Sequence, residues 1–264
     1  MTRQQTTTRP VPTSLADIVA GLELRQPKVV TRELLKDLTQ EVGSKIPTEV
    51  LAERLVRAGW LLPLRIQNAW EFAPAAHAGR YGWNDPWIEL RALLLHQPNA
   101  PVAVAFESSI WELGHTTHQP TKPVLAHRPK WHAPRVLGAR SISYDWRLPA
   151  VMVRGLPVWQ EATNLVAAAN RPAAQGDWGN ADDWLPETFQ SVTPEDVVKE
   201  MTGRGNATLA RLGYMAEWAG SNDIADLIDD LLPQGREVSY FGPRKSKSRW
   251  INRWRLYDTV LSQR

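Results

Sequence analysis

The spacing of apolar residues changes abruptly once in the first third of the chain, and this change limits the possible folds more than any other feature. Before Trp60, three stretches carry apolar side chains every three or four residues, which predicts three short helices. Ser14 and Thr31 are placed to cap the first two, and the third is predicted over 47–58. From Trp60 the period becomes two, and it continues beyond a polar turn to Phe72, which predicts a β-hairpin.

Three helices followed by a hairpin is the element order of a winged helix-turn-helix, whose third helix enters the major groove of DNA while the hairpin touches the flanking backbone. We therefore expect an α+β fold, with a winged helix-turn-helix over 14–85 and a larger mixed α/β domain over 86–264. The boundary is predicted within 74–85, where Ala, Gly and Pro occur without clear periodicity. Residues 1–13, rich in Thr with two prolines, are expected to form a flexible arm.

The composition excludes several classes of protein. No Cys occurs among the 264 residues, so disulfides, thiolate nucleophiles and cysteine-ligated zinc are excluded. The formal net charge of +3 and a sequence pI of about 9.3 favour an anionic partner. No apolar run approaches the roughly 20 residues of a membrane-spanning helix, and the start lacks a signal-peptide core. We expect a globular protein that works in the cytoplasm without contact with a membrane.

The third predicted helix carries a short polar face that suits a DNA groove. Lys45, Arg54 and Arg57 would neutralise phosphates, which supply affinity, while Thr48 would reach base edges, which supply specificity. Two carboxylates on the same helix weaken this patch. The alternative is that the domain is a protein-interaction module with a solvated polar face.

The tip of the predicted hairpin supplies the remaining DNA candidates. Arg65, Gln67 and Asn68 would be the contacts of the wing with the DNA backbone. The alternative is that these residues are polar only because turns are exposed, and the sequence leaves both readings open.

The rest of the chain alternates between short strand and helix signals. Helices are predicted for 87–96, 160–170, 208–220 and 222–232, and another begins at Thr193-Pro194-Glu195. A strand running into a helix is expected over 102–114, and strands are expected at 124–127, 141–146 and 150–154. Residues 171–186 are rich in Gly, Asn, Asp and Pro and are expected to form a loop, while 240–261 is ambiguous between strand and helix.

The order of motifs resembles the AbiEi antitoxins of the AbiE type IV toxin-antitoxin systems. The matching pieces, in chain order, are Val29 to Leu35 with Leu55 to Leu61, Ala103 to Gly114 with Lys122-Pro123-Val124, Arg154-Gly155-Leu156-Pro157-Val158, and Ala210 to Glu217, which contains Leu-Gly-Tyr. The resemblance implies an antitoxin that represses its own operon by binding double-stranded promoter DNA and neutralises a nucleotidyltransferase toxin. In this class direct contact with the toxin is not required. The loop over 177–186 and the basic end over 244–255 match nothing in the family pattern.

The basic end mixes cations with aromatic residues. The cations Arg244, Lys245, Lys247, Arg249 and Arg253 are interleaved with Tyr240, Phe241, Trp250 and Trp254. Such a mixture suits nucleic acid through charge and stacking. In the competing interpretation the Trp residues belong to the core, and the cations form a solvated or partner-binding surface.

No motif of an enzyme emerges from the remaining polar residues. His115, His118, His127 and His132 have no zinc-motif spacing and are expected to lie on the surface, and the Asp residues of 223–230 are expected on a solvated helix face. No phosphate-binding loop or nucleophile elbow is present, so we expect no cofactor, no metal and no catalytic activity. The alternative is a Mg²⁺-dependent nuclease that a winged helix delivers to DNA, with Asp177, Asp182 and Asp183 as metal ligands.

Overall fold

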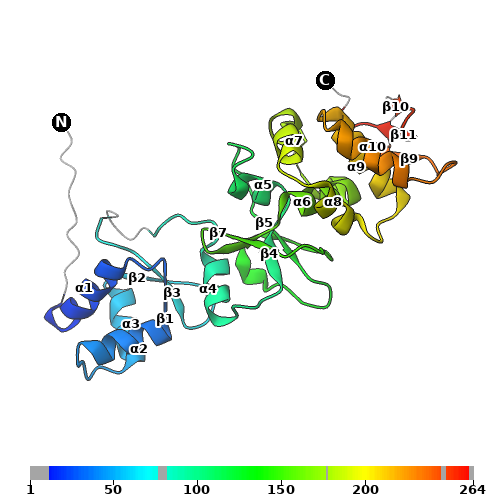
Figure 1. Cartoon of the computed structure of the whole chain (residues 1–264). Helices are drawn as coiled ribbons and strands as arrows, with labels where there is room; N and C mark the ends of the chain where they lie inside the picture. Colours follow the sequence, from blue (N-terminus) through cyan, green and yellow to red (C-terminus); the bar gives the residue numbers. More distant parts are fainter. Residues whose placement is uncertain (1–11, 77–81, 177, 245–247, 262–264) are drawn as a thin grey trace, which may run out of the picture. The chain divides into compact units, whose positions relative to one another are not determined.

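The computed structural model describes residues 12–76, 82–176, 178–244 and 248–261 and confirms a mixed α+β architecture. The chain forms two compact units: Met1–Ala100 with Pro134–Gly138, and Pro101–Ala133 with Ala139–Arg264 (Figure 1). None of the helices in the described ranges has the length and hydrophobicity needed to cross a membrane.

The first unit contains helices around a small antiparallel sheet with strand order β1-β3-β2. Its elements are η1 (Thr13–Leu15), α1 (Ala16–Arg25), β1 (Val29–Thr31), α2 (Arg32–Glu41), α3 (Thr48–Arg57), β2 (Leu61–Pro63), β3 (Ala69–Phe72), α4 (Ile88–His96) and η2 (Arg135–Leu137). The helices and the hairpin of β2 and β3 therefore occur in the predicted order. Strand β1 was not predicted, because three residues carry too little periodicity to be recognised without the pairing partner β3.

Local signals in the sequence explain where these helices begin and end. The Thr31 hydroxyl accepts a hydrogen bond from the Leu34 N–H at 3.3 Å and caps α2 as expected. Gly43, just beyond α2, has a φ of 63°, a conformation that favours glycine. The apolar stripes of the helices meet in one core, whose fully buried members include Leu22, Leu35, Leu38, Leu51, Leu55 and Phe72.

The first unit extends past residue 85, where the sequence predicted the boundary. Helix α4 packs on the sheet, and its Ala92 is buried against Val29 and Ala69. Asp85 accepts hydrogen bonds from Lys28 Nζ and Arg91 Nε, each at 2.8 Å. Burial raises the pKa of Asp85, but these hydrogen bonds, with one from the backbone, hold it below its ordinary value. The segment predicted to link the domains is thus tied into the first unit.

The second unit contains two sheets and a group of helices. A five-stranded mixed sheet has the order β6-β5-β4-β8-β7, and a three-stranded sheet has the order β10-β11-β9, with β11 parallel to β9. The strands are β4 (Val102–Val104), β5 (Val124–His127), β6 (Arg140–Ser143), β7 (Val151–Val153), β8 (Leu156–Val158), β9 (Ser239–Phe241), β10 (Arg249–Ile251) and β11 (Leu256–Asp258). The helices are α5 (Glu107–Leu113), α6 (Glu161–Asn170), η3 (Pro172–Ala174), α7 (Ala181–Gln190), α8 (Pro194–Met201), α9 (Asn206–Trp218) and α10 (Asn222–Leu231).

Helix α6 lies at the centre of the second unit. Every residue from Ala162 to Ala169 is buried, because α6 contacts other helices around its circumference. Glu200 of α8 is fully buried beside it and accepts hydrogen bonds from the Arg147 and Leu148 N–H groups at 2.8 and 3.0 Å. Its other oxygen pairs with Arg204 at 3.1 Å. Glu200 therefore connects α8 to the segment between strands β6 and β7 of the five-stranded sheet.

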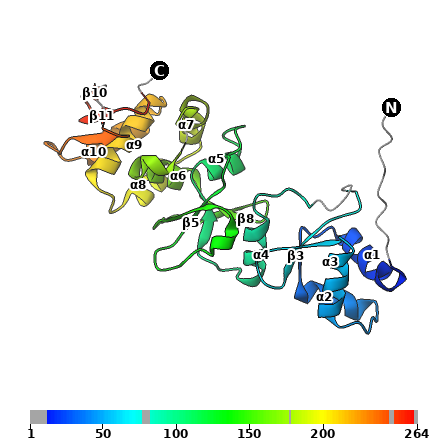
Figure 2. The ribbon, with the colours of Figure 1, turned by 180° about the vertical axis from the view of Figure 1, so that it is seen from behind.

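Helix α9 lies beside α10 (Figure 2) and also packs against β9. Gly213 of α9 lies directly against the indole of Trp254, which is fully buried. The indole Nε1 donates to Glu217, one turn further along the helix. The neighbouring Tyr214 donates to Asp258 Oδ2 at 2.9 Å, and burial, followed by this carboxylate, raises the pKa of Tyr214. The Leu-Gly-Tyr sequence of α9 is thus where the three-stranded sheet joins the unit.

The prediction of a loop over 171–186 is wrong for its last part. Helix α7 begins at Ala181 and contains Pro186 in its interior. Buried Trp184, Leu185 and Phe189 form an apolar stripe, and burying this stripe outweighs the hydrogen bond that proline cannot donate. The ambiguous segment 240–261 forms strands and turns where the structure describes it.

Candidate nucleic-acid interface

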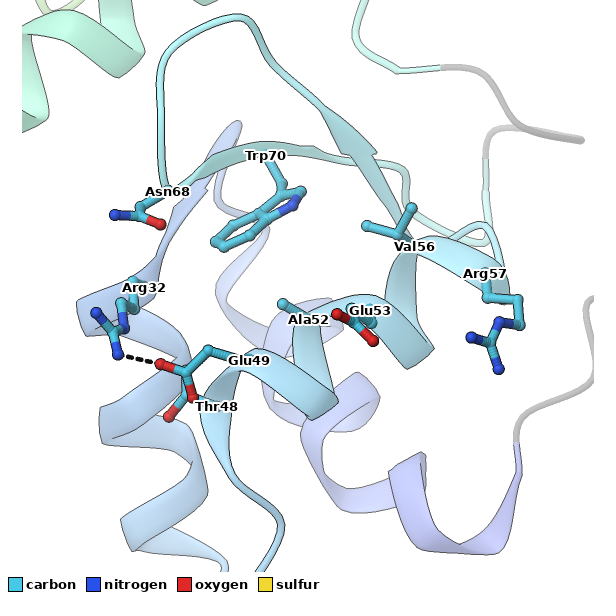
Figure 3. Close-up of a pocket in the computed structure, with 9 residues that line it drawn as sticks. All are labelled: Arg32, Thr48, Glu49, Ala52, Glu53, Val56, Arg57, Asn68 and Trp70. Carbon is cyan, nitrogen blue, oxygen red and sulfur yellow. Dashed lines mark hydrogen bonds and ion pairs between the residues drawn. The ribbon is translucent and has the colours of Figure 1, made fainter.

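Helix α3 presents a polar face because its apolar residues are used on the other side. Leu51, Ala52 and Leu55 are buried in the core, so the remaining side chains line the surface. Between α3 and strand β3 lies an open hollow of about 460 Å³ (Figure 3). It is lined by Arg32, Thr48, Glu49, Ala52, Glu53, Val56, Arg57, Asn68 and Trp70.

Three of the seven DNA candidates of the first unit line this hollow. These are Thr48 at the start of α3, Arg57 at its end and Asn68 from the hairpin turn. Arg57 also lines a second hollow of about 350 Å³ together with Arg54, Leu15 and other residues near η1. Four of the seven candidates thus line two hollows that share Arg57.

The other three candidates lie outside both hollows. The side chains of Lys45, Arg65 and Gln67 are exposed, Lys45 just before α3 and the other two in the hairpin turn.

The charge of this surface is more positive than the sequence of α3 suggests. Glu49 forms an ion pair with Arg32 of α2, drawn as the dashed line in Figure 3. A hydrogen bond from its own backbone, followed by the Arg32 charge, lowers the pKa of Glu49, which stays ionised and neutralised by its partner. Among the residues that the structure describes, none forms an ion pair with the predicted cations Lys45, Arg54, Arg57 and Arg65. Their charges face solvent.

The hairpin turn is held rigidly by the first unit. Leu64 and Ile66 pack against a cluster that includes Ala92 of α4. The backbone N–H of Arg65 donates to the Glu89 carboxylate at 3.0 and 3.2 Å. Asn68 adopts a φ of 57°, the left-handed conformation that Asn tolerates. Because alternate residues point inward, the side chains of Arg65 and Gln67 are exposed on a fixed backbone.

Sequence reasoning did not identify Arg32 and Trp70 as part of this surface. Arg32 begins α2, and its ion pair with Glu49 spans 17 positions, so no local pattern signals it. The alternating pattern placed Trp70 in a strand without indicating a role at the surface. Its side chain is partly exposed because it faces the hollow.

Of the candidates in the basic end, Arg253 is bound within the second unit. Its guanidinium lies 2.6 Å from Asp226, 3.1 Å from Asp229 and 3.8 Å from Glu217. Two Asp residues predicted on a solvated helix region therefore serve as its partners. Arg244 lies over the Tyr240 ring at 4.3 Å from the centroid, and Arg249 is exposed. Lys245 and Lys247 lie outside the described residues.

The histidines and aspartates do not gather into a metal site in the part of the chain that the structure describes. His115 is buried rather than on the surface, and its Nε2 lies 3.0 Å from Glu161. The hydrogen bond to Glu161 raises the pKa of His115 against the opposing effect of burial. Asp182 and Asp183 lie in the first turn of α7, with Asp183 4.0 Å from His118, and Asp177 lies outside the described residues.

Comparisons with known proteins agree with the resemblance described above. Residues 102–218 match the model of the AbiEi antitoxin C-terminal domain, which confirms the predicted resemblance. The crystal structure of the RV2827C protein from Mycobacterium tuberculosis is similar with a TM-score of 0.83 and 25% sequence identity. The alignment covers 96% of this chain and 93% of that chain. No curated protein matches.

Proposed function

We propose that this chain, whose residues 102–218 match the AbiEi antitoxin C-terminal domain, is an antitoxin that represses its own operon through the first unit and counteracts a nucleotidyltransferase toxin through the second. The family match supports the antitoxin role. The observation that carries the DNA-binding role is the surface around α3, where four cations lack an internal ion pair among the described residues. Both activities belong to the cytoplasm, where an operon and its products meet.

The geometry of the first unit supports a winged helix-turn-helix. Helix α3 has ten residues and is roughly 15 Å long, a length that fits the major groove. Lys45 lies just before its amino end and Arg57 is its last residue, so they would meet phosphates on the two sides of the groove. Thr48 would contact base edges at the helix start. Arg65, Gln67 and Asn68 would contact the flanking backbone from the rigid turn.

Replacing Arg57 with Ala tests the phosphate contact. We expect weaker binding to promoter and scrambled duplexes alike, and a plot of log affinity against log salt that is flatter by about one unit of slope. Fluorescence anisotropy at several salt concentrations measures both quantities. Arg25→Ala is the matched control, because Arg25 is also an exposed arginine of the first unit but is paired with Glu41 at 2.6 Å.

Thr48→Ala separates base recognition from phosphate binding. A lost base contact removes about 1 to 3 kcal/mol of the preference for the promoter over the scrambled duplex and leaves the salt slope unchanged. Equal losses on both duplexes would assign Thr48 to the backbone. If Arg57→Ala and Arg54→Ala leave both duplexes bound as in the wild type, the first unit is not the DNA reader, and the protein-interaction alternative replaces it.

Co-expression with the adjacent gene, which the proposal expects to encode a nucleotidyltransferase toxin, tests the antitoxin role. From a foreign promoter, the wild-type chain is expected to restore the growth of cells that express the toxin. Arg57→Ala is expected to restore growth equally, because repression is bypassed and the second unit is intact. Continued growth arrest with soluble wild-type chain would contradict the proposal and return attention to the nuclease alternative, which Mg²⁺-dependent cleavage lost in Asp182→Ala or Asp183→Ala would support.

A further inference from the structure

The three-stranded sheet of the second unit carries one aromatic residue on each strand, in exact register. Trp250 of β10 pairs with Tyr257 of β11, and Tyr257 pairs with Tyr240 of β9. The Tyr240 and Tyr257 rings are stacked, with centroids 5.5 Å apart and an interplanar angle of 26°. The Trp250 ring lies 4.9 Å from that of Tyr257. The rings form a continuous aromatic row across the sheet (strands labelled in Figure 1).

The aromatic row faces away from the core of the second unit. The residues that flank Tyr257 on its strand, Leu256 and Asp258, are fully buried, and Ile251 next to Trp250 packs against the core. Side chains alternate along a strand, so the row lies on the opposite face. Trp250, at the end of the row, keeps 42% of its surface exposed. Contacts that only stabilise the sheet do not require an exposed indole at the end of the row.

The end of the chain that carries the aromatic row is basic in composition. Residues 240–264 contain seven Lys and Arg but a single carboxylate, Asp258, which is buried and bonded to Tyr214. Arg244 lies over Tyr240 at the end of the row opposite Trp250. In the described ranges Arg244 makes no ion pair with a carboxylate. Arg249 is the register partner of Asp258 and therefore lies on the face opposite the row. Open aromatic and cationic groups thus occur side by side without a partner of opposite charge.

We propose that this face binds single-stranded nucleic acid, with a base stacked on Trp250 and a phosphate neutralised by Arg244. Bases within a duplex already stack on one another, whereas an unpaired base has a free face that suits an exposed indole. The Arg244 cation complements the negative charge of a nucleic-acid backbone. An uncharged peptide would make no use of this cation. The site is independent of the duplex-binding surface proposed for α3, since it uses other residues in another unit.

Trp250→Ala tests the proposal in the full chain. Labelled twelve-nucleotide oligo-U and oligo-dT are titrated at low salt by fluorescence anisotropy, and we expect affinity for both to fall about tenfold. Trp250→Phe keeps a ring and should retain most of the binding. Arg244→Ala should weaken binding and flatten its salt dependence. Tighter binding of oligo-U than of oligo-dT would identify RNA, through its 2′-hydroxyl, as the preferred strand.

The controls separate stacking from folding and from duplex binding. Met152→Ala removes another exposed apolar side chain of the same unit, 68% exposed, and should bind the oligonucleotides as the wild type does. Trp250→Ala should keep the wild-type melting temperature and the wild-type affinity for promoter duplex. Unchanged oligonucleotide affinity in folded Trp250→Ala, or no binding of either strand by the wild type, would overturn the proposal.

Discussion

Glu200→Ala is expected to lower the free energy of unfolding of the second unit by about 3 to 5 kcal/mol, the cost of breaking a buried charge pair. The Glu200 side chain is fully buried, and the change leaves two backbone N–H groups and the Thr163 hydroxyl without their acceptor. It also strips the partner from Arg204, whose side chain is only 12% exposed. An uncompensated cation would remain inside the fold.

Urea unfolding combined with amide hydrogen exchange measures this effect and locates it. Peptides from the second unit should lose protection in Glu200→Ala, while peptides from 12–76 should keep it. Glu195→Ala on the same helix is the matched control, since Glu195 is exposed and its loss should change stability by less than about 0.5 kcal/mol. The loss of unfolding free energy in Glu200→Gln should lie between the losses in Glu200→Ala and Glu195→Ala. A wild-type unfolding midpoint in Glu200→Ala would show that the buried pair is replaceable.

Gly213→Ala is expected to destabilise the second unit by roughly 3 kcal/mol, although Gly to Ala inside a helix normally stabilises by about 1 kcal/mol. A Cβ at position 213 would overlap three ring atoms of Trp254. That indole is fully buried and bonded to Glu217, so it has no free space into which to move. The sign of the effect therefore reports the contact between α9 and the three-stranded sheet.

A double-mutant cycle makes this prediction specific. Trp254→Phe alone should be destabilising because it leaves a cavity, but combined with Gly213→Ala it should restore part of the lost stability, since the smaller ring makes room for the methyl group. Gly205→Ala at the start of the same helix is the control, because a Cβ there meets nothing within 4 Å. Additive effects in the cycle, or a stabilising Gly213→Ala, would contradict the close contact.

The elements that the sequence predicted well are those whose signals are local. The helices of the first unit were predicted from their apolar stripes, with Thr31 marking a helix start and Gly43 a helix end. The helical hairpin of α9 and α10 was predicted from its own periodicity. The AbiEi resemblance was recognisable because its motifs are short and ordered. The candidate DNA-binding residues on α3 could be chosen because the apolar stripe is buried, which leaves one face of the helix for polar side chains.

The features that the sequence did not reveal depend on distant partners. Helix α7 was predicted as a loop because Pro186 and a polar start conceal its buried Trp184 and Phe189. Strand β1 is recognisable only beside β3, and the Arg32 to Glu49 pair only once α2 and α3 are packed. The aromatic row likewise requires the pairing of β11 with two strands that are not both its neighbours in the chain. Contacts of this kind follow from the assembled fold.

The strand order β10-β11-β9 has a consequence for biosynthesis. The middle strand is the last of the three to leave the ribosome, and Trp254, which closes the surface of α9, precedes it by only two residues. In a nascent chain that has been made as far as α10, the surface of α9 at Gly213 therefore stays uncovered until Trp254 is synthesised. During that interval the second unit would present apolar surface to chaperones and proteases, so the supply of folded protein is coupled to the synthesis of β11.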